Sequence, residues 1–114
     1  MCYNFIGDKM ILKTKDKNIP VKTCIKFKDR FIGLMFKKNI KIGYLFPRCN
    51  SIHTFFMKEK IDVILLDKNN KIIKIYKNLS PNKIILPKRK VYSILELPNN
   101  TSEIFELNEK IKIS

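Results

Sequence analysis

Apolar and polar residues alternate in short segments along most of this chain, and that pattern predicts β-strands. Residues 21–26, VKTCIK, place Val, Thr and Ile at alternate positions, which is typical of a strand with one buried face. Residues 71–77, KIIKIYK, follow the turn signal Asp67–Asn70 and return as the second strand of a hairpin. Segments of this kind predict strands over 9–14, 21–26, 52–57, 61–66, 71–77, 91–97 and 110–113.

The longest apolar runs lie in residues 42–67. Residues 61–66, IDVILL, are almost continuously apolar, as expected for a strand that is covered on both faces. Residues 52–57 are mostly β-branched or aromatic, and only the charged link Lys58–Lys60 separates the two segments. A link this short predicts that the two strands are antiparallel neighbours in the core.

A helical period occurs in residues 27–36, where Phe27, Phe31, Leu34 and Met35 lie on one face. No other segment of comparable length shows this period. One helix facing the core is therefore predicted here.

The remaining segments connect these elements. Residues 78–87 contain two prolines and are predicted as a loop that crosses a sheet edge, and residues 100–107 as a helical turn capped by Thr101 or Ser102. The predicted fold class is α+β, mainly β: a small closed or partly closed antiparallel β-barrel with one or two short helices.

Several short motifs give the chain a family resemblance. From Pro47 to Asp67 it contains PRCNSIHT, then a Met, then I-D and L-D pairs. This order resembles the P-C-x-x-I-H-T-x-x-M-x-x-x-I-D pattern of one branch of the domain-of-unknown-function 192 (DUF192) family. Arg30 with residues 33–35 is similar to the family's R-x-x-G-L-M segment, and residues 94–98 are similar to its L-E-L-P segment.

The resemblance covers residues 21–113 and leaves residues 1–20 as a lead. It implies one compact, mainly β domain that is similar to a small barrel and has no established activity. Three turns depart from the family pattern: Glu59-Lys60 replaces Phe-Pro, Asn99-Asn100 lacks a glycine, and Asn108-Glu109 replaces Gly-Asp. Asparagine can adopt the left-handed conformation that glycine otherwise supplies, so turns are still expected at the two asparagine sites.

Length and composition agree with a single domain over residues 1–114. A chain of this length with 45% hydrophobic residues can bury one core. No apolar run approaches the roughly 20 residues of a membrane-spanning helix, and the N-terminus lacks the apolar region of a secretory signal. A cytoplasmic location is therefore expected.

Three cysteines, Cys2, Cys24 and Cys49, form no C-x-x-C motif and cannot all pair within the chain. Reduced thiols are the simplest interpretation. No metal site and no cofactor are predicted.

The formal net charge of +14 suggests an acidic partner, either nucleic acid or an anionic membrane face. However, the lysines are spread along the chain, and the only arginines, which would make bidentate phosphate contacts, are Arg30, Arg48 and Arg89. A solvated basic surface is therefore favoured, and nucleic-acid binding is not expected.

Three polar side chains interrupt apolar strands and are the chemical candidates: His53, Asp62 and Glu96. A buried carboxylate needs an ion pair, hydrogen bonds or a proton. These acids either bond internally, to backbone amides, a lysine or Arg30, or they line a pocket together with Cys49. Arg30 likewise is either an ion-pair partner of Asp62 or Glu96, or an anion-binding group at the pocket edge.

The predicted function is a ligand- or partner-binding accessory module with a polar pocket around His53, Asp62 and Glu96. Its partner would be an unknown small ligand or a protein. The alternative is a small enzyme that uses Cys49 and His53, with or without a metal held also by Asp62. A third hypothesis, nucleic-acid binding, rests on the lysine-rich surface alone.

Overall fold

The computed structural model describes residues 9–14, 18–23, 41–55 and 57–114. Nine strands and one 3-10 turn, η1, are present in these residues. Their bounds are β1 Lys9–Lys13, β2 Asn18–Thr23, β3 Gly43–Pro47, β4 Ile52–His53, β5 Ile61–Leu66, β6 Ile72–Leu79, β7 Ile84–Ile85, β8 Ser93–Pro98, η1 Ser102–Ile104 and β9 Lys112–Ile113.

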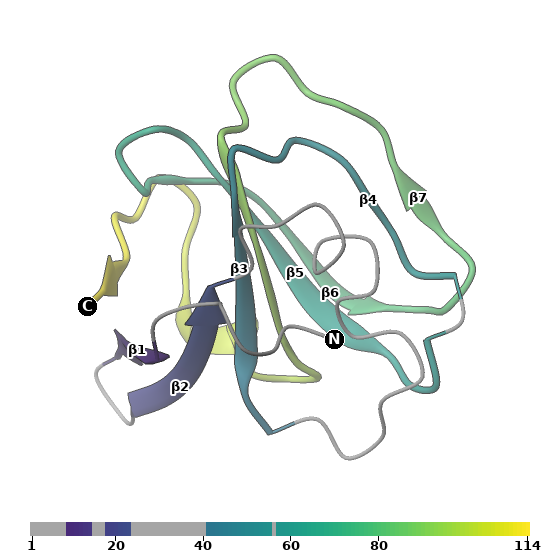
Figure 1. The fold of residues 1–114 in the computed structure, drawn as a ribbon, viewed down its shortest axis with the longest axis horizontal. Helices are drawn as coiled ribbons and strands as arrows, with labels where there is room; N and C mark the ends of the chain where they lie inside the picture. The colour runs from purple at the N-terminus through teal and green to yellow at the C-terminus, as the bar shows by residue number, and fades with distance from the viewer. Residues whose placement is uncertain (1–8, 15–17, 24–40, 56) are drawn as a thin grey trace.

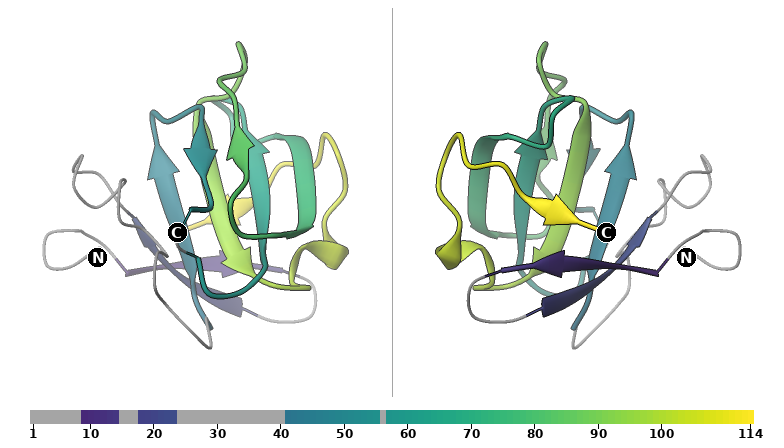
Figure 2. Two further views of the ribbon diagram at one scale, coloured as in Figure 1. Left: turned by 90° about the vertical axis from the view of Figure 1, so that its right-hand side faces the viewer. Right: turned by 90° about the vertical axis from the view of Figure 1, so that its left-hand side faces the viewer.

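Seven strands form one strongly curled sheet with the order β6-β5-β8-β3-β2-β1-β9 (Figure 1). In the views of Figure 2, β1 and β2 run across the direction of β3, β8 and β5, so the sheet bends round into a half-barrel. The prediction of a mainly β, barrel-like fold is confirmed, but the barrel is open. Among the described residues, residues 108–111 link its two ends, because they hydrogen-bond to the start of β6 around the isolated bridge Lys71–Lys110.

The prediction of a wholly antiparallel barrel is wrong at one seam. β2 and β3 are parallel, with Val21 opposite Gly43 and Thr23 opposite Leu45. A parallel pair needs a crossover of about a dozen residues or more, and the chain between Thr23 and Gly43 is long enough to supply it. All other neighbouring strands in the large sheet are antiparallel.

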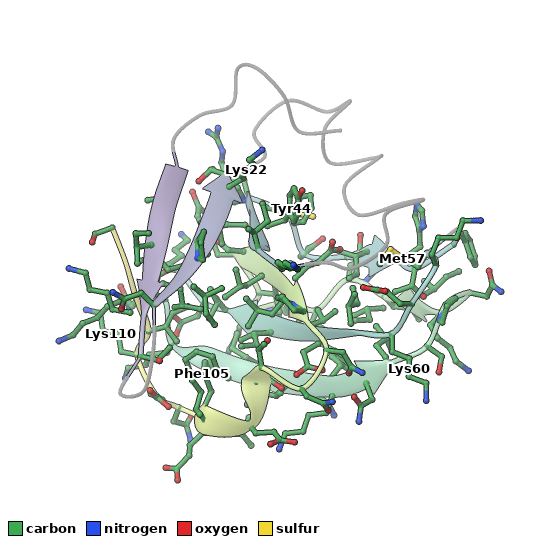
Figure 3. All side chains as sticks on the ribbon, turned by 90° about the horizontal axis from the view of Figure 1, so that it is seen from below. Lys22, Tyr44, Met57, Lys60, Phe105 and Lys110 are labelled. Carbon is green, nitrogen blue, oxygen red and sulfur yellow. The ribbon has the colours of Figure 1, made fainter. Side chains whose placement is uncertain are left out.

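β5 lies between β6 and β8 in the sheet, and all six of its residues are buried. Its odd-numbered residues Ile61, Val63 and Leu65 belong to one hydrophobic cluster, cluster A, while Ile64 and Leu66 belong to a second, cluster B. Figure 3 shows Tyr44 and Met57, of cluster A, on one side of the central strands and Phe105, of cluster B, on the other. The prediction that residues 61–66 form a strand covered on both faces is therefore confirmed.

β4 does not pair with β5, so the predicted hairpin between residues 52–57 and 61–66 is wrong. β4 instead pairs with β7, which lies within the segment predicted as a loop. Thr54 is the reason: its buried hydroxyl donates to the carbonyl of Ser80 at 2.8 Å and accepts from the amide of Lys83 at 2.8 Å. These bonds hold the end of β4 beside residues 80–83, and the β4–β7 ribbon covers cluster A.

The hairpin of β5 and β6 is confirmed. In its turn, Oδ1 of Asp67 accepts from the amides of Asn69 and Lys71, and Asn70 has a left-handed φ of 62°. Asn100 and Asn108 have φ of 68°, so asparagine supplies the left-handed residue where the family pattern has glycine nearby.

The predicted helix over residues 27–36 lies outside the described residues, as do Arg30, Cys2 and Cys24. Within the described part of the chain η1 is the only helical element, and it is one turn long. Thr101 occupies its N-cap position as predicted, but the Thr101 side chain makes no capping hydrogen bond. No helix in the described ranges is long and apolar enough to cross a membrane.

Candidate functional site

Asp62 faces cluster B's side of the sheet, where its carboxylate makes internal hydrogen bonds. Its Oδ2 accepts hydrogen bonds from the backbone amide and the hydroxyl of Ser102, at 2.8 and 2.6 Å, and its Oδ1 accepts one from the amide of Asn78 at 3.0 Å. The carboxylate thus caps the first turn of η1 from a distant strand. Of the two outcomes weighed for Asp62, the geometry agrees with internal hydrogen bonding to backbone amides.

Glu96 lies in a different environment. On β8 it stands opposite Tyr44 of β3 and Val63 of β5, and paired residues of an antiparallel sheet share a face. Its neighbours are therefore the apolar side chains of cluster A. The Glu96 side chain is 6% exposed, and Oε1 has no hydrogen-bond partner among the described residues. Burial away from water raises the pKa of Glu96 to about 8.

Asp62 and Glu96 are not brought together. Asp62 pairs with Leu97 and Glu96 pairs with Val63, so the two carboxyl groups point to opposite faces of the sheet. The predicted pocket containing both acids is not formed. In this register each even-numbered residue of β5 lies opposite an odd-numbered residue of β8 and shares its face. Two even-numbered residues, one on each strand, therefore face opposite sides of the sheet.

Cys49 packs against cluster A, on the side of the sheet that Glu96 faces. Its Sγ donates to the carbonyl of Ser51 at 3.2 Å, and its amide donates to the carbonyl of Tyr92 at 3.0 Å.

His53 faces away from cluster A. Ile52, its neighbour on β4, packs against that cluster, and side chains alternate along a strand. Nδ1 of His53 accepts from the amide of Phe55 at 3.2 Å, and the two rings stack with centroids 5.0 Å apart. The Cys49 thiol and the His53 ring therefore contact different residues, Ser51 and Phe55. In the part of the chain that the structure describes, no three His, Cys, Asp or Glu side chains gather as metal ligands.

Two features of the molecule were not predicted from the sequence. Tyr44 stands directly opposite Glu96, a neighbour that only the register of β3 and β8 reveals. A hollow of about 380 Å³ lies on cluster B's side, lined by Thr14, Ile104, Phe105, Glu106 and Glu109. The three-residue spacing of Glu103, Glu106 and Glu109 was the only sequence signal at this place.

The family model of DUF192, described as an uncharacterized ACR, matches residues 10–114. The chain belongs to the DUF192 family. A UPF0127 protein of Pyrococcus horikoshii is 36% identical over 113 residues, covering 90% of this chain and 97% of the relative. A UPF0127 protein of Pyrococcus furiosus is 36% identical over 98 residues, covering 82% and 84%.

Two crystal structures have the same fold as this DUF192 protein. One is a Sinorhizobium meliloti 1021 protein suggested to be a transcription regulator, with a TM-score of 0.75, 20% identity, and coverage of 93% of this chain and 91% of that one. The other is a Novosphingobium aromaticivorans protein of unknown function, with a TM-score of 0.71, 13% identity, and coverage of 93% and 83%. At these identities the likeness concerns the fold, and the family itself is uncharacterised.

Proposed function

We propose that this DUF192 protein is a binding module and that Glu96 makes the polar contact with its ligand or partner. One observation supports the proposal: Oε1 of Glu96 is buried and has no hydrogen-bond partner among the described residues. Buried polar atoms in folded proteins are nearly always hydrogen-bonded. A bound molecule is one source of the missing partner.

The pKa of Glu96 indicates which chemical groups would suit it. With a pKa of about 8 the carboxyl is mainly protonated at neutral pH, so it offers one O–H donor and one carbonyl acceptor. An amide group offers the complementary pair, an N–H donor and a carbonyl acceptor. A peptide segment or a small amide-bearing molecule is therefore the ligand class that we propose.

Arg30 is the other candidate partner. Both oxygens of Asp62 already accept hydrogen bonds, so of the two acids predicted to pair with Arg30, Glu96 has the free oxygen atom. A guanidinium beside Glu96 would favour the carboxylate and lower the pKa of Glu96, whereas burial alone raises it. Titration of Glu96 by carboxyl carbon NMR therefore distinguishes the two partners.

The alternative function, a Cys49 and His53 enzyme, has less support. Nucleophilic catalysis requires the thiol and the imidazole within hydrogen-bond reach. Here the thiol donates to Ser51, and Nδ1 of the imidazole accepts from Phe55. The mechanism of a binding module needs neither group, and it also needs no metal.

Native mass spectrometry of the protein purified without chelator tests the proposal. The wild type is expected to carry an organic adduct. Glu96→Leu removes both hydrogen-bonding functions and should lose the adduct, whereas Glu96→Gln retains a donor and an acceptor and should keep it. Glu103→Gln, at an exposed site, is the matched control and should also keep it. A wild type of bare mass, or an adduct that survives in Glu96→Leu, contradicts a Glu96 site.

A further inference from the structure

The β4–β7 ribbon has a buried face and an exposed apolar face. Ile52 and Ile85, paired across the ribbon, pack on cluster A. On the other face, Ile84 stands opposite His53, and the His53 ring stacks on Phe55. Ile84 is 58% exposed, Leu86 is 70% exposed and Phe55 is 37% exposed. We call these three residues the apolar ridge.

Exposed cations border the apolar ridge. Lys83 precedes it, and Lys88, Arg89 and Lys90 follow it, all on the surface. No aspartate or glutamate occurs between Asp67 and Glu96, so the segment that carries Ile84, Leu86 and the bordering cations contains positive charges only. The acidic residues are thus unevenly distributed along the chain, since Glu103, Glu106 and Glu109 lie beyond this segment.

The ridge is held in place by the fold. The amide of Val91 donates to the carbonyl of Lys88 at 3.2 Å, which closes a turn at the three consecutive cations. The amide of Tyr92 donates to Leu66 on β5 at 2.8 Å, and the amide of Lys83 donates to the Thr54 hydroxyl at 2.8 Å. In both views of Figure 2 the chain that follows β7 projects beyond the ends of the strands, so the cations stand at a tip of the molecule.

We propose that the apolar ridge and its bordering cations dock this protein on an anionic phospholipid surface. Exposed aliphatic side chains gain free energy by entering the boundary between headgroups and acyl chains, and bordering lysines attract the phosphate headgroups at the same time. A nucleic acid would satisfy the cations but would leave Ile84 and Leu86 without an apolar partner. Lysine also suits headgroups that can rearrange, whereas ordered phosphates are usually bound by arginine forks.

Co-sedimentation of the full chain with lipid vesicles tests the proposal. Binding to phosphatidylglycerol vesicles is expected, with little binding to phosphatidylcholine vesicles, and the affinity should fall as salt screens the charges. Absence of binding to phosphatidylglycerol, or equal binding to both lipids, would overturn the proposal.

Two variants separate the charged from the apolar part. Replacing Lys88, Arg89 and Lys90 by Gln should weaken binding about a hundredfold, since each cation near an anionic membrane contributes about fivefold. Replacing Ile84 and Leu86 by Thr should weaken it about tenfold or more at unchanged net charge, because the buried aliphatic area is lost. All five side chains are exposed, so thermal unfolding monitored by circular dichroism should remain at the wild-type temperature.

A charge-matched control replaces three exposed lysines on or beside β9 and its partner β1: Lys13, Lys110 and Lys112. This variant should lose much less affinity than the variant that replaces Lys88, Arg89 and Lys90. An equal loss would mean that net charge alone drives association and that no docking surface exists. Binding to a single- or double-stranded oligonucleotide that is tighter than binding to vesicles, and that is lost when Lys88, Arg89 and Lys90 are replaced, would identify a nucleic acid as the partner and overturn the proposal.

Discussion

Asp62 accepts two hydrogen bonds from Ser102, which lies 40 positions later in the chain. The contact attaches η1 to β5, and the third bond of Asp62 attaches Asn78 of β6. One acid therefore fixes three segments that the sequence keeps far apart.

Asp62→Asn should destabilise the fold by about 2 to 4 kcal/mol, because an amide nitrogen would face a donor and the charge-assisted bonds would be lost. Ser102→Ala removes one of the three bonds and should cost about 1 kcal/mol. Urea unfolding measures both free energies. Glu103→Gln is the exposed control, and a change there as large as that of Asp62→Asn would contradict this role.

Glu96 should make the stability of the protein depend on pH. Its pKa is raised from 4.5 to about 8 in the folded state, so between these pH values the folded state binds a proton that the unfolded state has released. The contribution of Glu96 to stability should therefore be greatest below about pH 4.5 and fall by roughly 3 to 5 kcal/mol as the pH rises to about 8.

Urea unfolding over this pH range, in the wild type and in Glu96→Gln, isolates the effect of the one carboxyl. The difference between the two proteins should shift in favour of Glu96→Gln as the pH rises. A difference that is constant with pH, or that shifts in favour of the wild type, would indicate a cationic partner such as Arg30.

Gly43 occupies the parallel seam between β2 and β3, where no side chain fits. A Cβ atom there would lie 2.8 Å from Cδ2 of Leu97, 3.2 Å from Cγ2 of Val21 and 3.3 Å from the carbonyl oxygen of Glu96. Leu97 is fully buried and has little space to move. Gly43→Ala should destabilise the fold by about 1 to 3 kcal/mol. Adding Leu97→Val should recover part of the loss, and strict additivity of the two substitutions would show that they do not clash.

Thr54 should control the attachment of β4 to β7. Thr54→Val keeps the shape but leaves the amide of Lys83 and the carbonyl of Ser80 without their partner, at a cost of about 1 to 3 kcal/mol. Amide exchange of Lys83 should become faster than in the wild type. Thr54→Ser retains the hydroxyl and should leave the exchange rate almost unchanged. Equal acceleration in both variants would show that the Thr54 hydrogen bonds do not cause the slow exchange.

Local patterns predicted the strands better than they predicted the pairing. The run at 61–66 and the turn at Asp67 determine β5 and its hairpin, since both signals lie within a few residues. The partner of β4 is set by the hydroxyl of Thr54 and by residues 80–83, which no local period connects.

The candidate site shows the same limit. Burial of Asp62 and Glu96 follows from their apolar neighbours, and both are buried as expected. Whether they face each other depends on the register of β5 against β8, which pairs Asp62 with Leu97. A shift of one residue would have placed both acids on one face, so the sequence could identify the two acids but not their separation.

The parallel pairing of β2 with β3 also affects the order in which the chain folds. β5 and β6 can pair across a tight turn, but β2 and β3 can pair only after the long connection from Thr23 to Gly43 has been closed, and such non-local contacts form late. We expect β5, β6 and β8 to form the folding nucleus. During synthesis β1 and β2 emerge first but have no sheet to join until β3 and its partner β8 have followed. The part of the sheet that is made first is therefore the part that is fixed last.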